Sequence, residues 1–248
     1  MIEAIRLGVY SREATLWDGV DLAFDAGSVW VVTGPASSGK TVLLSILRGE
    51  RQPDAGDVVV SGESLYRGSA EAARTFRASS GHVPERFSDG PGQTVEGLLR
   101  LSALAGGGVM TPGEFRERQV HLLSMVGLDG AEKWGLSSLS TSERVRAALA
   151  AELLRGPRYL FGDGVVAAAG RAHWYMLGGL FRALSREGNT IVLAERCLPE
   201  RWAAAAGEGM AAGPFRICRL PLTAPPDPAV RSNRPSVTDA TGGKGVQG

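Results

Sequence analysis

The segment that most constrains the fold is GPASSGKT, residues 34–41, because of the patterns on either side of it. The apolar run at residues 29–32 suits a buried strand, and residues 42–47 carry apolar side chains at helical spacing. In the pattern G-x-x-x-x-G-K-[ST], successive backbone N–H groups wrap a phosphate, and the following helix points its positive end at the anion. Strand, glycine loop and helix in this order predict a phosphate-binding loop.

The side chains of this loop have separate predicted roles. Lys40 is expected to contact the β- and γ-phosphates of a nucleotide, and the hydroxyl of Thr41 is expected to ligate magnesium. The chain has three lysines against 24 arginines, so a lysine at the required position is less easily accidental. The alternative is an ordinary glycine-rich turn, which the flanking strand and helix argue against. The predicted nucleotide-binding residues here are Gly34, Pro35, Ala36, Ser37, Ser38, Gly39, Lys40 and Thr41.

A phosphate-binding loop needs a second side chain near the magnesium, normally an aspartate at the end of a neighbouring apolar strand. The segment RYLFGD, residues 158–163, ends in Asp163. An aspartate before a glycine is also a common turn residue, and that alternative stays open for the segment taken alone. Its position after a predicted helix at residues 140–154 favours the magnesium role.

The rest of the chain alternates between strand and helix patterns, which predicts a parallel α/β sheet interrupted by a helical insertion at about 84–138. After residue 222 the sequence is dense in Pro, Gly, Ser and Thr, and we expect residues 223–248 to form a disordered tail. The further strands are expected at residues 20–24, 57–61, 159–161 and 190–194, and the further helices at 140–154 and 172–186.

Charge and composition exclude several classes of protein. The 27 basic and 26 acidic residues give a formal net charge of +1, so no global field favours nucleic acid, and no nucleic-acid partner is expected. There is no run of roughly 18 apolar residues that could cross a bilayer, and the two cysteines lack a C-x-x-C spacing. These features predict a cytoplasmic protein that reaches a membrane only through another chain.

The segment LSTSE, residues 139–143, with the helix after it and the strand ending at Asp163, resembles the signature region of ABC transporter ATPases, usually LSGGQ or LSGGE. Tyr10 resembles the aromatic residue that stacks on adenine in this family. The resemblance covers residues 1 to about 215. It implies an α/β fold with a RecA-like P-loop NTPase core, N-terminal antiparallel β strands and an inserted α-helical subdomain, and we assign residues 1–222 to this ABC-type ATP-binding domain.

Within this family the length and layout look most like the bacterial cell-division ATPase FtsE and its lipoprotein-releasing relatives. The resemblance implies ATP and Mg²⁺ as ligands and a transmembrane partner, a permease or an FtsX-like subunit. It also implies a head-to-tail dimer that sandwiches ATP between the phosphate loop of one copy and the signature of the other, where Ser140 could donate a hydrogen bond. The protein would lie at the inner face of the membrane.

The departures from the family concern hydrolysis. The family's catalytic glutamate aligns with Gly164, which has no side chain to act as a general base. The family's glutamine near the magnesium aligns with Glu85, which joins Thr41 and Asp163 as a predicted metal-side residue. The family's histidine aligns with Arg196. Glu85, Glu195 and Arg196 are therefore the possible substitutes, although a solvated charge pair is the alternative for Glu195 beside Arg196.

Two further departures lie near the dimer contact. Thr141 and Ser142 stand where the signature normally has glycines, and residues 165–170 lack the family's aspartate. Losing a general base costs about 10²- to 10⁴-fold in rate, so the resemblance implies an ATPase with slow turnover. The alternative is a scaffold that binds nucleotide without hydrolysis. A P-loop kinase or GTPase is a third possibility, but its guanine-recognition or acceptor motif is missing.

Overall fold

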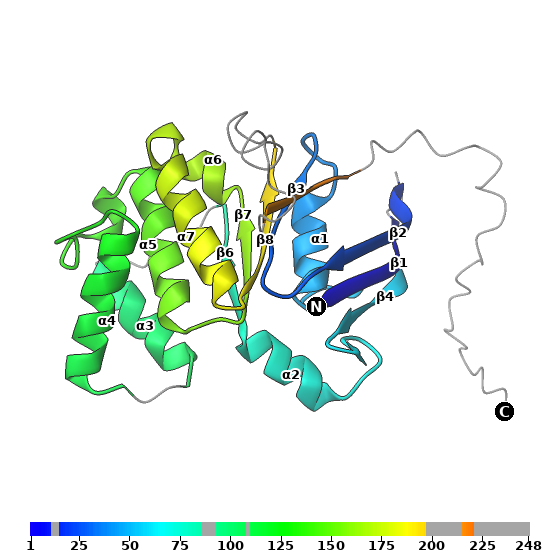
Figure 1. The fold of residues 1–248 in the computed structure, drawn as a ribbon, viewed down its shortest axis with the longest axis horizontal. Coiled ribbons are helices and arrows are strands. Elements are labelled where there is room, and N and C mark those ends of the chain that lie inside the picture. The colour runs from blue at the N-terminus through cyan, green and yellow to red at the C-terminus, as the bar shows by residue number, and fades with distance from the viewer. Residues whose placement is uncertain (11–14, 86–92, 108–109, 197–214, 221–248) are drawn as a thin grey trace, which may run out of the picture.

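The computed structural model describes residues 1–10, 15–85, 93–107, 110–196 and 215–220. Its elements form layers (Figure 1): an antiparallel sheet, a helix, a parallel sheet, and a group of helices on the far side of the parallel sheet. The N-terminus lies beside the antiparallel sheet. The architecture is the α/β fold with N-terminal antiparallel strands that the sequence predicts.

The antiparallel sheet has the strand order β2-β1-β4-β5. Residues of β1 such as Ile2, Ala4 and Val9 are buried, so one face of the sheet packs on the core. The ladder between β1 and β4 is irregular between Ile5 and Gly8, as expected at a β-bulge. The strands are β1 (Ile2–Tyr10), β2 (Thr15–Phe24), β4 (Ala55–Val60) and β5 (Glu63–Ser64).

The parallel sheet has the strand order β6-β7-β8-β3-β9. All six residues of β8 are buried, which is typical of a parallel strand covered on both faces. Because the strands are parallel, their carboxyl ends meet at one edge, and the loop after β3 lies there with the ends of β6, β7 and β8. The strands are β6 (Ser80–Val83), β7 (Tyr159–Asp163), β8 (Thr190–Glu195), β3 (Val29–Thr33) and β9 (Phe215–Arg219).

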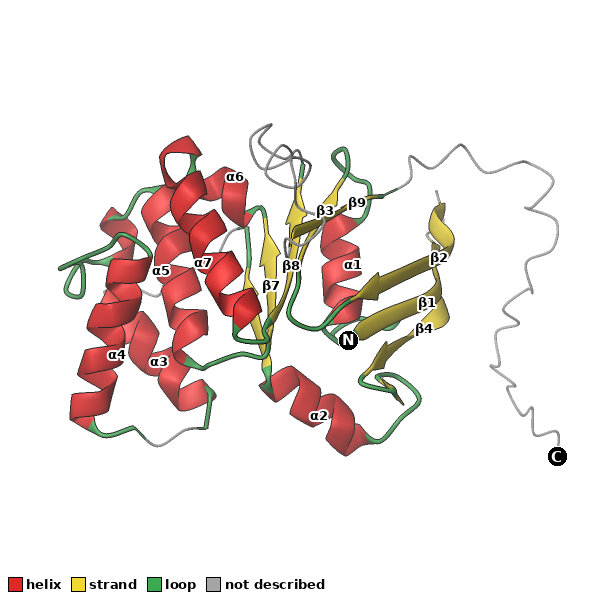
Figure 2. Ribbon diagram, viewed as in Figure 1, coloured by secondary structure: helices red, strands yellow, loops and turns green. Residues whose placement is uncertain are grey.

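Helix α1 (Lys40–Leu47) lies between the two sheets (Figure 2). It buries Leu43, Leu44, Ile46 and Leu47 in the core formed with β1 and β2. The helices of the opposite side include α5, α6 and α7 against the parallel sheet, with α3 and α4 beyond α5. The remaining helices are α2 (Ala70–Ala78), α3 (Val95–Ala105), α4 (Pro112–Met125), η1 (Leu136–Ser138), α5 (Thr141–Leu154), α6 (Val165–Ala169), η2 (Arg171–His173) and α7 (Trp174–Arg186).

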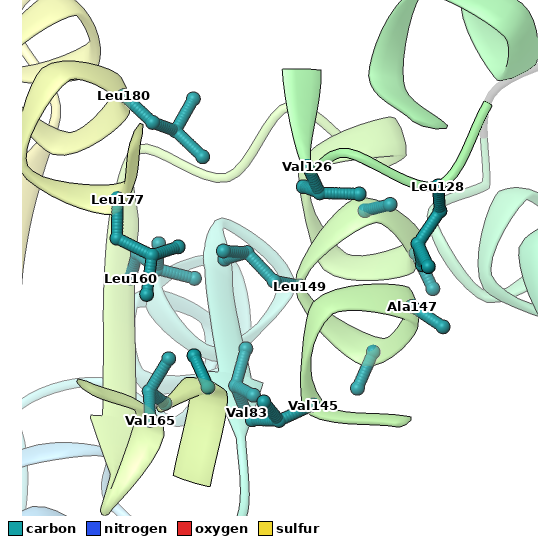
Figure 3. Close-up of a cluster of buried hydrophobic side chains, with 14 of the residues drawn as sticks. Val83, Val126, Leu128, Val145, Ala147, Leu149, Leu160, Val165, Leu177 and Leu180 are labelled. Carbon is teal, nitrogen blue, oxygen red and sulfur yellow. The ribbon is translucent and has the colours of Figure 1, made fainter. Parts of the chain in front are cut away.

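A second hydrophobic core lies between the parallel sheet and the helices on its far side, and helix α5 is at its centre (Figure 3). It packs against α3 and α4 on one side and reaches β6 and α6 on the other. Its buried residues therefore surround the axis instead of forming one stripe, as expected for a helix covered on several sides. Small side chains such as Ala147 and Ala150 are fully buried and allow close approach, while Leu149 fills the space toward the sheet.

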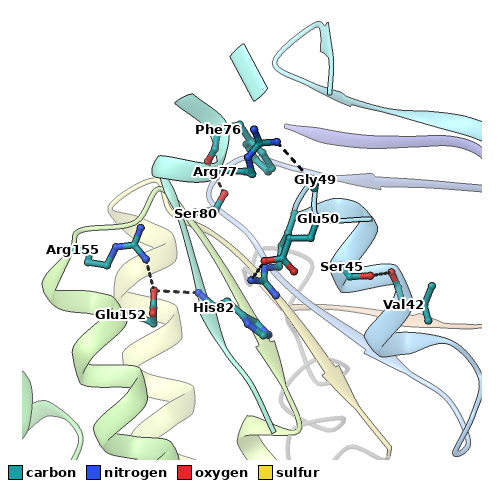
Figure 4. A network of polar contacts seen from close by, with 11 residues as sticks. Val42, Ser45, Gly49, Glu50, Phe76, Arg77, Ser80, His82, Glu152 and Arg155 are labelled. Atoms are coloured by element: carbon teal, nitrogen blue, oxygen red, sulfur yellow. Dashed lines mark hydrogen bonds and ion pairs between the residues drawn. The ribbon is translucent and has the colours of Figure 1, made fainter. Parts of the chain in front are cut away.

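A polar network joins the end of α5 to β6 (Figure 4). Glu152 Oε2 accepts hydrogen bonds from the backbone N–H of His82 at 3.2 Å and from Arg155 at 3.1 Å. Burial raises the pKa of Glu152, and the bonds to Arg155 and His82 oppose that rise. Burial also lowers the pKa of His82 to about 4, so this histidine is neutral near pH 7 and packs as a structural residue.

The strands expected at residues 159–161 and 190–194 and the helix at 140–154 are confirmed. The sequence patterns did not predict α2, β6, α6 or β9. Helices α3 and α4 fall inside the expected insertion at 84–138. The predicted tail at 223–248 lies outside the described residues. Within the described part of the chain, no helix is both long and apolar enough to cross a membrane.

Candidate functional site

The glycine loop between β3 and α1 rests on the antiparallel sheet. Trp17 of β2 is almost completely buried, and its indole Nε1 donates a hydrogen bond to the backbone oxygen of Ser38 at 2.9 Å. Gly39 has a φ of 86°, and a Cβ there would lie 2.4 Å from the indole ring. Only glycine allows this contact. The indole therefore helps to fix the shape of the loop, although Trp17 was not among the residues predicted for the site.

Lys40 lies across the opening of the loop as the first residue of α1. Its Nζ donates hydrogen bonds to the backbone oxygens of Gly34 at 2.8 Å and Pro35 at 2.7 Å, and to Ser38 Oγ at 3.3 Å. Burial lowers the pKa of Lys40, and the negative charge of Asp163 opposes this shift. The first N–H groups of a helix have no partner inside it. The ammonium group and the start of α1 together suit an anionic phosphate group.

Thr41 and Asp163 come together from α1 and β7, as the magnesium prediction requires. Thr41 Oγ1 donates a hydrogen bond of 2.6 Å to Asp163 Oδ2. A hydroxyl and a carboxylate are oxygen ligands of the kind that Mg²⁺ takes together with phosphate oxygens and water. In the part of the chain that the structure describes, no group of three or more His, Cys, Asp or Glu side chains is placed to hold a metal ion by itself. The pair fits a magnesium ion shared with a phosphate ligand.

Gly164 follows Asp163 and begins α6 with a left-handed backbone, φ 62°. A Cβ at this position would lie 3.1 Å from Cγ of Glu85. The Glu85 carboxylate is directed toward Arg196, with Oε1 4.0 Å from the guanidinium nitrogen, and both side chains are more than half exposed. An exposed ion pair of this length contributes little to stability. The structure thus brings the predicted residues Glu85, Gly164 and Arg196 together at this edge of the sheet.

Glu195 at the end of β8 is buried and only 1% exposed. Its carboxylate accepts hydrogen bonds from the backbone N–H groups of Val166 at 2.7 Å and Ala167 at 3.3 Å, in the first turn of α6. Burial raises the pKa of Glu195 to about 7, the two amide bonds act against the rise, and the charges of Asp163 and Glu85 add to it. The solvated charge pair considered for Glu195 is therefore wrong, because α6 covers the side chain.

The signature segment begins α5 with a capping box. Ser140 Oγ donates to Glu143 Oε2 at 2.7 Å, while the backbone N–H of Glu143 points back to Ser140 Oγ at 3.3 Å. The hydrogen bonds that the hydroxyl and the backbone N–H of Ser140 donate to the Glu143 carboxylate lower the pKa of Glu143. Ser142 Oγ donates to the backbone oxygen of Ala169 at 2.6 Å. The hydroxyl of Ser140 bonds within its own chain, and its contact with the nucleotide of another copy stays a prediction.

Tyr10 ends β1 and lies back across that strand. Its hydroxyl donates to Asp18 Oδ1 at 2.7 Å, and its backbone N–H donates to Asp54 Oδ2 at 2.8 Å. A Cβ on Gly8 would lie 2.5 Å from the tyrosine oxygen, so the absence of a side chain at Gly8 leaves room for the ring of Tyr10. The side chain is 36% exposed. Its predicted stacking on adenine stays a prediction.

A cavity of about 710 Å³ joins the ends of β6 and β7 to the start of α5. Glu85 and Gly164 line one part of it, and Ser140 and Thr141 line another. The other lining residues are Pro84, Leu139, Arg144, Val145, Ala167 and Ala168. The cavity gives solvent access to Glu85.

Comparisons with known proteins agree with this geometry. The family described as ABC transporter matches residues 17–167. The macrolide export ATP-binding/permease protein MacB of Marinobacter nauticus is 30% identical over 176 residues, which cover 71% of this chain and 27% of MacB. The methionine import ATP-binding protein MetN of Thermobifida fusca is 30% identical over 198 residues, covering 78% of this chain and 61% of MetN. The chain thus spans less than two thirds of either relative.

Solved structures show the same fold. The dimeric bacterial ABC transporter cassette MJ0796 superposes with a TM-score of 0.73 at 22% identity, covering 88% of this chain and 94% of that one. The same cassette in a post-hydrolysis state bound to ADP and Pi gives a TM-score of 0.74 at 22% identity, with 89% and 94% covered. At this level of identity the likeness concerns the fold.

Proposed function

The chain belongs to the ABC transporter family, and we propose that it is an ATP-binding subunit that binds MgATP and acts on a transmembrane partner with weak or absent hydrolysis. The observation that carries this proposal is the meeting of Lys40, Thr41 and Asp163 at the carboxyl edge of the parallel sheet. The names of the relatives support it, because MacB is an ATP-binding/permease protein and MetN an ATP-binding protein.

In this proposal the residues at the carboxyl edge of the parallel sheet bind different parts of MgATP. The loop at residues 34–39 and the start of α1 surround the phosphates, and Lys40 neutralises the β- and γ-phosphate charge. Thr41 and Asp163 would hold Mg²⁺, which would neutralise part of the phosphate charge. Tyr10, at the end of β1, stacks on the adenine ring.

A second copy of the chain completes the proposed site. The dimeric MJ0796 cassette supports a dimer, and in the proposed arrangement Ser140 at the start of α5 faces the nucleotide of the other copy. The proposed partner is a transmembrane permease or FtsX-like subunit, which would hold this chain at the inner face of the membrane, and the proposed subtype is FtsE-like.

The proposed weakness of hydrolysis follows from Gly164. A residue without a side chain cannot orient or deprotonate water, and loss of a general base costs about 10²- to 10⁴-fold in rate, or roughly 3 to 5 kcal/mol. A scaffold without hydrolysis is the second candidate. It is favoured by α6, where Val165 to Ala169 form a short helix with no carboxylate of its own.

Isothermal titration calorimetry with MgATP tests ATP binding. Lys40→Ala removes a charged partner of the phosphates, and hydrogen bonds to charged groups contribute about 1.5–3 kcal/mol, so the Kd should rise roughly 10- to 100-fold. Lys133→Ala is the matched control, because Lys133 is an exposed lysine on the helical side of the molecule. An unchanged Kd in Lys40→Ala, or wild-type protein that does not bind ATP, contradicts the proposed function.

A further inference from the structure

Residues 85 and 164 stand side by side at the end of the parallel sheet. Strands β6 and β7 are parallel neighbours, and Val83 pairs with Gly162. Glu85 and Gly164 each follow that pair by two residues. The Cβ, Cγ and Cδ atoms of Glu85 lie 3.6, 3.1 and 3.6 Å from the position that a Cβ on residue 164 would take. The side chain of Glu85 thus occupies space that a side chain on residue 164 would enter.

The other carboxylates described at this edge are engaged elsewhere. Asp163 accepts the hydrogen bond from Thr41 and belongs to the proposed magnesium pair. Glu195 is buried, and its two oxygens accept the backbone N–H groups of α6. The side chain of Glu85 is 53% exposed and lines the 710 Å³ cavity. Of these three carboxylates, Glu85 is the most exposed to water.

We propose that Glu85 is the general base of slow ATP hydrolysis at this site, supplied by β6 where residue 164 of β7 supplies no side chain. This inference rests on the proposed function. A water oxygen attacks the γ-phosphorus and the water passes a proton to the Glu85 carboxylate. The bond from the γ-phosphorus to the bridging oxygen breaks, and its electron pair leaves with ADP. The products are ADP and inorganic phosphate, and Glu85 returns the proton to solvent.

Arg196 has a positioning role in this scheme. Its guanidinium nitrogen lies 4.0 Å from Glu85 Oε1, so the positive charge draws the carboxylate across the end of β7. The same charge offsets part of the repulsion between Glu85 and the phosphates. Arg196 stands directly after the buried strand β8, which fixes its backbone while the side chain stays exposed.

The test compares Glu85→Gln with Glu117→Gln, an identical change at an exposed site on α4. MgATP binding is measured by calorimetry, turnover by phosphate release, and the retained nucleotide by chromatography after rapid desalting. Glu85→Gln should lower turnover by about 10²- to 10⁴-fold and retain ATP where the wild type retains ADP. It should also bind MgATP more tightly, by roughly threefold, because a like charge near the phosphates is removed in a water-like dielectric.

Each outcome bears on a different claim. Turnover and Kd that match the wild type in Glu85→Gln overturn the proposal for Glu85. A wild type that binds MgATP but never releases phosphate also overturns it, and leaves the ATP-binding function in place. A wild type that does not bind MgATP overturns the proposed function itself. A Glu117→Gln protein that loses turnover equally shows a general effect of charge and counts against Glu85.

Discussion

Glu195→Gln is the substitution whose effect on stability follows most directly from the structure. The wild-type carboxylate is 1% exposed and has a pKa of about 7, against 4.5 for an ordinary glutamate. Folding therefore favours the protonated form. Below pH 4.5 the carboxyl group is protonated in both the folded and the unfolded state, so it does not lower the free energy of unfolding. As the pH rises, the unfolded chain ionises first, and the free energy of unfolding falls until the pH passes about 7.

The size of this fall follows from the shift. A difference of about 2.5 pKa units, at 1.36 kcal/mol for each unit, corresponds to about 3 kcal/mol lost between pH 4.5 and 8. A glutamine has no charge to develop, so the variant lacks this loss. The amide nitrogen of the glutamine cannot accept a hydrogen bond from one of the backbone N–H groups of α6. This lowers the free energy of unfolding by the same amount at every pH. The free energy of unfolding of Glu195→Gln minus that of the wild type should therefore rise by about 3 kcal/mol.

Urea denaturation at pH 4.5, 6, 7 and 8, without nucleotide or magnesium, measures this difference. Subtracting the two proteins removes the contribution of all other titrating groups that the substitution leaves unchanged. Glu187→Gln, an exposed change at the end of α7, should follow the wild type across the whole range. A difference for Glu195→Gln that stays within about 0.5 kcal/mol from pH 4.5 to 8 would refute the argument that burial by α6 controls this carboxyl group.

Two further predictions concern groups that connect separate elements. Trp17→Phe keeps most of the ring but leaves the backbone oxygen of Ser38 without its 2.9 Å donor, so the free energy of unfolding should fall by about 1–2 kcal/mol in urea denaturation. Arg146→Met removes two hydrogen bonds to the backbone oxygens of Val126 and Gly127. It should lower the unfolding free energy by about 2–3 kcal/mol, whereas Arg116→Met on exposed α4 should leave it within 0.5 kcal/mol.

Local sequence was sufficient for the elements whose signals are strong. The run before Gly34 and the pattern after Lys40 predicted β3, the glycine loop and α1, because each depends on side chains close together in the chain. Helix α2 was missed because Ala73 and Phe76 are its only buried residues, so it offers a single large apolar side chain as a signal. Strand β9 was missed because two arginines interrupt its short apolar run.

The site divides in the same way. The meeting of Thr41 with Asp163 follows from the strand order that a phosphate-loop protein adopts, and the sequence predicted both residues. The burial of Glu195 could not be predicted, because it depends on α6 folding over the end of β8. The contact between Glu85 and Gly164 likewise depends on β6 lying next to β7, and residues about 80 positions apart in the sequence carry no local signal for it.

The buried helix α5 has a mechanical consequence. It is 14 residues long, about 21 Å at 1.5 Å per residue, and it is fastened at three places along that length. Ser142 ties its first turn to the end of α6, Arg146 ties its middle to the turn after α4, and Glu152 ties its last turn to β6. A displacement of α4 should therefore move α5 as a whole, because these three contacts hold α5 along its length. We expect α5 to move as a rigid helix and to transmit the displacement to β6 through the bond between Glu152 and His82. Glu85 stands three residues after His82, so the displacement would reach it as well.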